Sequence, residues 1–313
     1  MNLRLSILII RLMGVALSCL VAASHAQEDP LVTPGAPLFY GAGAKPEGRI
    51  HYDIALIEAI LMAQDIDLKK HPVVMKSAFT FARQKHELAK SRVHLVETAP
   101  YVDLGSQAQR IDMPLYMGLL GYRRGLIRKE QQVFFQQLNS LEELIKGARI
   151  GMGGWPDVDI LKANNIPVIT YGVWDELFGM LAHRRMDYLP LGVMEAPTAL
   201  RNNVDEFPNL KVDDTLIFYY GFPRVFYSSN DHLTGVISKG FQSIINDGQH
   251  RALMEAHFAD SMQFLRGSKA KIIVIPNPFL DEANALQKPI LIKDYQDRLL
   301  PNTSTSTTHS PSS

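Results

Sequence analysis

The sequence predicts an α/β fold built as two lobes of similar design. In "YDIALIEAILMAQ", Ile54, Ile57 and Leu61 fall on one face of a helix, and "ARIGM", "IPVITY" and "LIFYYGF" are short β-type runs between helical segments. Two distant segments, residues 88–95 and 181–189, each end an amphipathic helix with basic residues and then enter an apolar strand. Alternation of helices and strands is typical of α/β folds, and the repeated pattern indicates two lobes. A chance match over so few positions is the alternative.

Capping residues predict where several helices begin and end. We expect helices to begin near Ser77 and Asp175, whose side chains are good N-caps. In "SLEEL", Ser140 and Glu143 form a capping box that opens a short helix. Gly248 is placed to end the long helix of "LTGVISKGFQSIIND".

The composition excludes several classes of protein. The chain has 313 residues, 46% of them hydrophobic, which suffices for one large domain or two of ordinary size. Its formal net charge is 0, so nothing indicates nucleic acid or an anionic membrane as partner. The histidines are scattered without an HExxH motif, and no GxSxG motif is present. The sequence therefore predicts no metal site, no cofactor and no serine-hydrolase site.

The first residues have the pattern of a secretory signal peptide. An apolar run with basic residues at its start, "ILIIRLMGVALSCLVAA", is followed by "SHA" and then by polar residues. This predicts a signal peptide over residues 1–26 with cleavage after Ala26. An uncleaved anchor and lipidation at Cys19 are the alternatives. Because Cys19 is the one cysteine of the chain, cleavage would leave no thiol for a disulfide, a metal or catalysis.

Several longer segments together resemble a known family. After the secretion signal, the chain carries "HYDIALIEAI", "LAKSRVHLVET", "IDMPLYMGLLGYRRGLI", "SLEELIKGARIGMGG", "DELFGMLAHRRMDYLP" and "SNDHLTGVISKGFQSIINDGQHRALMEAHF" in that order. Over roughly residues 35–280 they resemble the type 2 periplasmic solute-binding proteins (SBP family 3), which include the amino-acid-binding components of ABC importers. "GLLGYR", "GGWPDVDIL", "LFGML" and "NPFL" are similar to an uncharacterised bacterial branch of that family.

The resemblance implies the type II fold of two lobes joined by two crossover strands. We place these crossovers near Met113–Gly118 and Leu216–Gly221. Lobe 1 is then expected at residues 27–117 and 217–285, lobe 2 at 118–216, and a C-terminal extension at 286–313. From about residue 302 the extension, "NTSTSTTHSPSS", has no apolar residue to bury and is expected to be disordered.

The resemblance also implies a function. A monomer in the periplasm would capture a small polar metabolite, amino-acid-like or an amine, between its lobes. It would deliver this ligand to a membrane permease or report it to a sensor receptor. A periplasmic enzyme on the same fold, similar to a dehydratase, is the alternative.

The stretch "GGWPDVDIL" is a candidate ligand loop. It lacks the lysine of a phosphate-binding P-loop, and Pro156 and Asp157 remove a donor and add negative charge. We interpret Gly153 and Gly154 as letting the backbone approach the cleft, with Trp155 as a flat apolar wall. Packing of Trp155 behind the loop is the alternative.

Charged residues near the expected cleft bear on the sign of the ligand. In the family an arginine ahead of the first crossover binds a carboxylate, and Arg110 is the candidate here. The related branch carries "IRIPL" and "FPRG", where we align Asp112 and Leu191 of this chain with the arginines. Glu195 lies near the position of the acid that binds the ligand's amino group in the family. These substitutions predict an amine or neutral polar ligand rather than a plain carboxylate, unless Arg110 turns inward. A surface position for Arg110 and a helix-start role for Glu195 are the alternatives.

Tyr52 and Tyr116 lie in segments that should approach the cleft, as does Tyr122. They are candidates for contact with the ligand. A position in the core or at the rim is the alternative for each.

Overall fold

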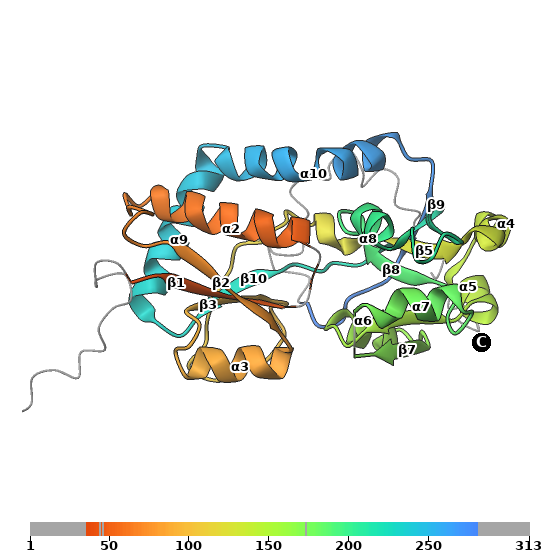
Figure 1. Ribbon diagram of the computed structural model, residues 1–313, viewed down its shortest axis with the longest axis horizontal. Coiled ribbons are helices and arrows are strands. Elements are labelled where there is room, and N and C mark those ends of the chain that lie inside the picture. Colours follow the sequence, from red (N-terminus) through yellow and green to blue (C-terminus); the bar gives the residue numbers. More distant parts are fainter. Residues whose placement is uncertain (1–35, 44, 46, 173, 281–313) are drawn as a thin grey trace, which may run out of the picture.

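The protein consists of two α/β lobes that lie side by side (Figure 1). The computed structural model describes residues 36–280, except for residues 44, 46 and 173. The predicted signal peptide (1–26) and the C-terminal extension (286–313) lie outside the described residues. No helix within 36–280 combines the length and the apolar character needed to cross a membrane.

The first lobe is built on a five-stranded sheet in the order β2-β1-β3-β10-β4. β1, β2 and β3 run parallel, and β10 is antiparallel to both β3 and β4. The strands are β1 (Leu38–Gly43), β2 (Val73–Phe79), β3 (Leu95–Thr98), β4 (Gln109–Ile111) and β10 (Val225–Ser228). Helices α2 (Glu47–Met62) and α9 (Asp231–Asn246) lie against one side of this sheet, and α3 (Phe81–Ala89) lies on the other (Figure 1). β3 is buried on both faces, as expected for a strand covered by helices on both sides.

The second lobe has a sheet in the order β11-β9-β5-β8, which β6 and β7 extend. The extension is made by Gly151 N, which donates to Tyr188 O over 2.9 Å at the start of β8. The strands are β5 (Tyr122–Arg128), β6 (Ile150–Gly153), β7 (Val168–Tyr171), β8 (Leu189–Gly192), β9 (Leu210–Tyr219) and β11 (Lys271–Val274). The helices of this lobe are η1 (Leu119–Gly121), η2 (Lys129–Gln131), α4 (Gln132–Gln137), α5 (Leu141–Gly147), α6 (Asp157–Ala163), α7 (Glu176–Ala182) and α8 (Ala196–Asn203).

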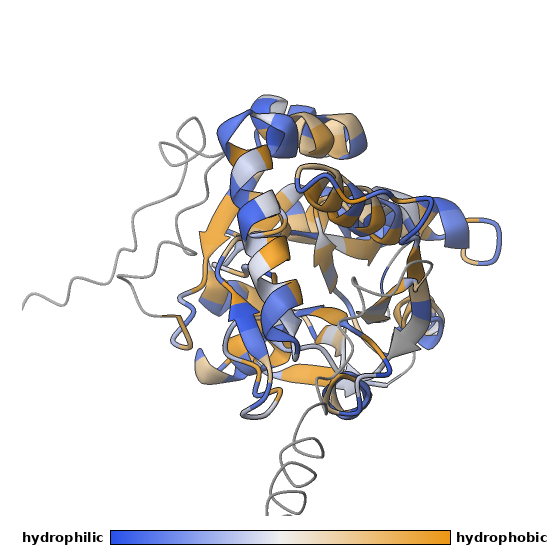
Figure 2. Ribbon diagram, turned by 90° about the vertical axis from the view of Figure 1, so that its left-hand side faces the viewer, coloured by the Kyte–Doolittle hydropathy of each residue, from blue (hydrophilic) through white to orange (hydrophobic). Residues whose placement is uncertain are grey.

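Hydropathy follows the burial of these elements. In Figure 2 the strands are mostly hydrophobic, whereas the helices that flank them carry hydrophilic and hydrophobic residues side by side. An outer helix needs one apolar face to pack on a sheet and one polar face for water.

Within the part of the chain that the structure describes, three passages connect the two sheets. Residues 112–121 lead from β4 to β5, and residues 220–224 lead from β9 back to β10. Leu115 N donates to Arg224 O over 2.9 Å and ties these two passages together. α10 (Gln249–Gly267) is the third passage and runs across both lobes (Figure 1).

The third passage changes the expected division of the chain. The sequence analysis assigned residues 217–285 to lobe 1, but β11 pairs in parallel with β9 in the second sheet. α10 has helical geometry except at Phe258, where φ is −129° and ψ is 24°. Beyond this break, Ser261 Oγ donates to Val193 O of the second lobe over 3.3 Å. The long helix thus returns the chain to the second lobe, a change of lobe that the apolar pattern of its sequence does not reveal.

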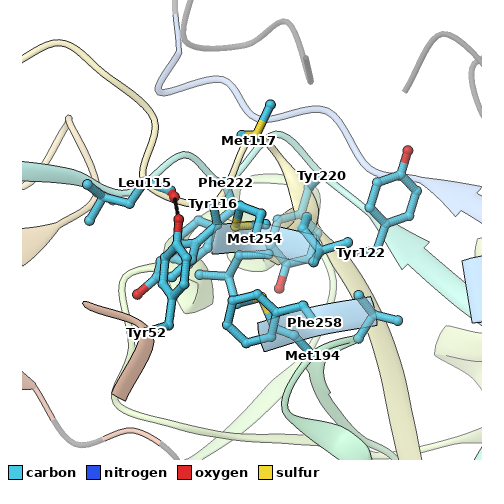
Figure 3. Close-up of a cluster of buried hydrophobic side chains, with 14 of the residues drawn as sticks. Tyr52, Leu115, Tyr116, Met117, Tyr122, Met194, Tyr220, Phe222, Met254 and Phe258 are labelled. Carbon is cyan, nitrogen blue, oxygen red and sulfur yellow. Dashed lines mark hydrogen bonds between the residues drawn. The ribbon is translucent and has the colours of Figure 1, made fainter. Parts of the chain in front are cut away.

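Aromatic and methionine side chains pack around the passages (Figure 3). Tyr52 OH donates to Leu115 O over 2.6 Å, and the Tyr52 ring lies 5.4 Å from Tyr116 and 5.0 Å from Phe258 between ring centres. His250 of α10 also lies 3.0 Å from Leu115 O through Nε2. The first crossover is therefore held by α2 and α10 together.

The two segments with the repeated helix–basic–strand pattern occupy separate sheets, as predicted. α3 leads into β3 of the first sheet, and α7 leads into β8 of the second. After each helix one residue adopts a positive φ, 52° at Ser91 and 62° at Arg184. This left-handed conformation ends both helices and turns the chain toward the strand.

The capping predictions are partly confirmed. Ser140 accepts a hydrogen bond from Glu143 N over 3.2 Å and begins α5, and Gly248, with φ of 83°, separates α9 from α10. α7 begins directly after Asp175 as expected, but the Asp175 side chain makes no capping hydrogen bond. Ser77 does not begin α3, because it lies within β2 and the N-cap is Thr80, which accepts from Arg83 N.

Two glycines of α9 provide a test of helix packing. A Cβ on Gly240 would lie 2.2 Å from Ile60 O of α2, whereas a Cβ on Gly235 would meet nothing within 4 Å. We expect Gly240→Ala to lower the free energy of unfolding by about 1–3 kcal/mol, because α2 and α9 must move apart. Gly235→Ala should leave it unchanged or raise it by up to about 1 kcal/mol through helix propensity. Urea unfolding followed by circular dichroism measures both, and equal effects of the two variants would contradict the close contact.

Candidate functional site

The edges of the two sheets that face each other enclose a small cavity. In open α/β sheets, ligands bind beyond the carboxyl ends of the strands, and here residues at the ends of β1, β3, β6 and β8 line one cavity. The cavity measures about 40 Å³. It is lined by Gly43, Lys45, Arg49, Glu97, Arg123, Trp155, Asp157, Trp174, Glu195, Phe222 and Arg224.

On the side of the first lobe, cations surround Glu97. This residue lies in β3, and its side chain is 1% exposed. Arg224 Nε donates to Glu97 Oε2 over 2.6 Å, and Lys45 Nζ donates to Oε1 over 2.7 Å. Lys45 also pairs with Asp53 of α2. β10 starts beside the end of β3, with Val225 opposite Thr98, and this register brings Arg224 to Glu97.

On the side of the second lobe, Arg123 lies between two carboxylates. Arg123 is at the start of β5, opposite Gly192 at the end of the antiparallel β8. Its Nη2 lies 2.9 Å from Asp157 Oδ2, and its Nη1 lies 3.5 Å from Glu195 Oε2. Asp157 Oδ2 also accepts from Tyr220 OH over 2.9 Å.

Arg49 connects the two groups of charges. This residue is in the first turn of α2, and its Nη1 donates to Glu195 Oε1 over 2.7 Å. Its Nη2 donates to Glu97 Oε1 over 3.3 Å and to Tyr116 OH over 3.1 Å. Tyr116 OH in turn donates to Asp53 over 2.6 Å. A single guanidinium thus contacts a carboxylate of each lobe.

The network contains as many cations as anions. The cations are Lys45, Arg49, Arg123 and Arg224, and the anions are Asp53, Glu97, Asp157 and Glu195. Buried charges are stable only when they are paired, and here every charge has an opposite partner. The site is therefore polar but neutral in sum.

Aromatic rings form the remaining wall of the cavity. Trp155 follows β6, and its ring centre lies 5.7 Å from that of Trp174. The Phe222 ring centre lies 4.9 Å from the guanidinium carbon of Arg123 and 5.6 Å from that of Arg224. A ligand group in the cavity would contact both flat apolar faces and charged groups.

Two carboxylates of the site, Glu195 and Glu97, are held in their ionised form. Burial raises the pKa of Glu195, but Arg49 and Arg123 outweigh it, so the pKa of this carboxyl lies below its ordinary value. Burial likewise raises the pKa of Glu97, and the cations around it hold that pKa well below its usual range. Within residues 36–280, no three His, Cys, Asp or Glu side chains converge to hold a metal ion.

The structure places two of the predicted site residues on the cavity, Glu195 and Trp155. Tyr116 lies directly behind it, bonded to Arg49 and Asp53. Tyr52 lies in the core, where its hydroxyl group bonds to the first crossover (Figure 3).

The other predicted residues lie away from the cavity. Arg110, in the edge strand β4, and Asp112, directly after that strand, form an ion pair on the surface, with side chains 37% and 57% exposed. A Cβ on Gly153 would lie 2.5 Å from the Trp155 indole, so this glycine makes room for that ring. Gly154 is exposed and faces an outer groove.

The sequence analysis did not find the basic residues of the site. It took the apparent loss of arginines at Asp112 and Leu191 as loss of cationic positions, yet four cations line the cavity. A usable pattern was present, since Glu97 and the pair Arg123 and Arg124 are charged residues within the mainly apolar segments "HLVETA" and "LLGYRRGLI". Charged residues in such strands are buried only when they are paired.

Comparison with known proteins supports the class of fold. No family model matches the chain, and no curated protein matches it. An ancestral arginine-binding protein bound to arginine is similar, with a TM-score of 0.52, 19% identity, and coverage of 71% of this chain and 98% of that one. A histidine kinase sensor domain with similarity to periplasmic binding proteins has a TM-score of 0.50, 13% identity, and coverage of 70% and 95%.

A further similar structure is the arginine-, lysine-, histidine-binding protein ArtJ from Geobacillus stearothermophilus. It is 13% identical, with a TM-score of 0.50, and the match covers 71% of this chain and 95% of that one. These structures define the fold as that of the two-lobed periplasmic binding proteins, as the sequence predicts.

The contribution of the buried network to stability can be tested against the surface pair. Glu195→Gln removes a buried charge, while Arg49 keeps its ion pair with Glu97 and Arg123 keeps its ion pair with Asp157. We therefore expect a loss of about 1–3 kcal/mol in the free energy of unfolding, less than for a fully orphaned charge. Asp112→Asn, which breaks the exposed pair with Arg110, should have little effect. Chemical denaturation measures both, and equal losses would show that burial of the network does not matter.

The lowered pKa of Glu195 predicts how this contribution depends on pH. A carboxyl with a folded-state pKa below its ordinary value, about 4.3, stabilises the fold above that value and loses its effect as the pH falls through the folded pKa. The stability difference between wild type and Glu195→Gln should thus be constant from about pH 8 to 5.5 and shrink below about pH 4. Burial lowers the pKa of His250, but this residue is common to both proteins and cancels in the difference. A difference that vanished near pH 6 would contradict the assignment.

Proposed function

We propose that this protein captures a small zwitterionic metabolite of the amino-acid type between its two lobes, outside the cytoplasm, for an importer or a sensor receptor. The observation that carries the proposal is the contact of Arg49 with Glu195 between the lobes. An ammonium group is complementary to Glu195, and a carboxylate is complementary to Arg49.

Such a ligand can enter without leaving any charge unpaired. When the lobes separate, Arg49 keeps its ion pair with Glu97, and Glu195 keeps its ion pair with Arg123. A zwitterion placed between them brings one charge of each sign, so the sum in the site stays neutral. A plain carboxylate or a plain amine would add an unbalanced charge to a buried network, which costs several kcal/mol.

The size of the cavity requires the lobes to move. A volume of about 40 Å³ is far below the roughly 300–1,000 Å³ of ordinary small-molecule sites. The three passages between the sheets, with the break of α10 at Phe258, are where such a separation would be absorbed, since hinges use a few residues at the ends of elements.

The same network favours binding over catalysis. A general acid or base works best with a pKa near the operating pH, whereas the pKa values of Glu97 and Glu195 are lowered. The dehydratase-like alternative has no comparable observation in its support. The fold is similar both to solute-binding proteins and to a kinase sensor domain, which is compatible with a permease or a receptor as the partner.

Calorimetry and thermal shift with a defined panel test the proposal. L-Amino acids should bind and raise the melting temperature, whereas succinate, putrescine and glycerol should not. Arg49→Gln and Glu195→Gln should each weaken amino-acid binding at least tenfold, or about 1.4 kcal/mol. The control Asp112→Asn should bind as wild type does. The proposal would be refuted if no amino acid of the panel bound, or if the substitutions at Arg49 and Glu195 left the affinity unchanged.

A further inference from the structure

Two buried polar atoms, on residues that line the cavity, have no hydrogen-bond partner among the described residues. They are Nε of Arg123, a donor, and Oδ1 of Asp157, an acceptor. Both residues line the cavity, and they are only 3% and 1% exposed. Leaving such groups without a hydrogen-bond partner is costly, about 1–3 kcal/mol each. Their lack of partners therefore calls for an explanation.

The other residues that the structure describes do not supply the missing partners. Asp157 Oδ2 already has two partners, Tyr220 OH at 2.9 Å and Arg123 Nη2 at 2.9 Å. The other carboxylate near Arg123, that of Glu195, is engaged by Arg49 and by Gly192 N. One donor and one acceptor therefore remain on adjacent side chains at the cavity.

The charges around these atoms select a neutral group. A ligand carboxylate that accepted from Arg123 would bring its second oxygen against Asp157, another anion. An ammonium that donated to Asp157 would lie against Arg123. A group that accepts and donates at neighbouring atoms, without net charge, satisfies both and leaves the balance of the network unchanged.

We propose that Arg123 and Asp157 form a subsite for a primary carboxamide carried by the ligand. The proposal rests on the proposed function and names the ligand's side chain. The amide oxygen accepts from Arg123 Nε, and the amide nitrogen donates to Asp157 Oδ1. Phe222, which lies over the Arg123 guanidinium at 4.9 Å, offers a flat face for the planar group. The cavity of about 40 Å³ has room for a small polar group, while the zwitterionic part of the ligand would lie between Arg49 and Glu195.

The first experiment compares ligands of the same shape. Calorimetry on the wild-type protein would use L-asparagine, L-aspartate and L-leucine, and then L-glutamine, L-glutamate and L-methionine. The amide of each set should bind at least tenfold more tightly than its acid and its apolar counterpart. L-Serine and L-threonine test whether a hydroxyl group serves instead, and tighter binding of these than of both amides would overturn the carboxamide assignment.

The second experiment inverts the subsite. In the variant Asp157→Asn, the new side-chain amide should turn its oxygen toward Arg123 and its NH₂ group toward the cavity. The subsite then presents two donors to the ligand, this NH₂ group and Arg123 Nε. The preference should shift from amide to acid by at least tenfold, an effect that loss of structure alone would not give. Asp159→Asn removes the same charge two residues further along α6, on an exposed side chain, and should leave the preference unchanged.

The outcomes separate this inference from the proposed function. Amino-acid binding that depends on Arg49 and Glu195 but shows no amide preference would overturn the subsite alone. The same holds if Asp157→Asn leaves the ratio of amide to acid unchanged, since Arg123 and Asp157 would then serve only each other. Absence of binding by all these amino acids would overturn both.

Discussion

The relation between the two lobes depends on one side chain, the guanidinium of Arg49. It donates to Glu195 of the second lobe and to Glu97 of the first, and it reaches Tyr116 at the start of the first crossover. A planar guanidinium with five donors can make these contacts at once. Each carboxylate that it contacts has another cation beside it, so the contact can open without orphaning a charge.

The remaining charges follow from this arrangement. Burying charged groups where two lobes meet is costly unless every one is paired, and the strands place them for pairing. The carboxyl ends of β1 and β3 carry Lys45 and Glu97, while Arg123 faces the end of β8. The aromatic rings of Trp155 and Phe222 limit contact with water, which strengthens the pairs. A neutral but strongly polar cavity results. We expect it to select ligands by their net charge rather than by the charge of any one residue.

The candidate site was only partly predictable. Glu195 and Trp155 could be located because each follows a recognisable strand in the segment order of the family. Arg49 could not, because it lies on α2 and reaches the site through a tertiary contact that spans 146 residues of sequence to Glu195. Arg110 and Asp112 were attractive by position, but they lie at the edge of the first sheet and pair with each other on the surface.

The sequence by itself determined the alternation of helix and strand, the presence of two α/β lobes and the residues that end several helices. These features depend on local propensity and apolar spacing, which are properties of neighbouring residues. Only the tertiary structure decided which charges meet, because ion pairs such as Arg224–Glu97 join residues 127 positions apart. It also decided that the chain returns to the second lobe through α10, since a strand such as β11 has the same apolar pattern in either sheet.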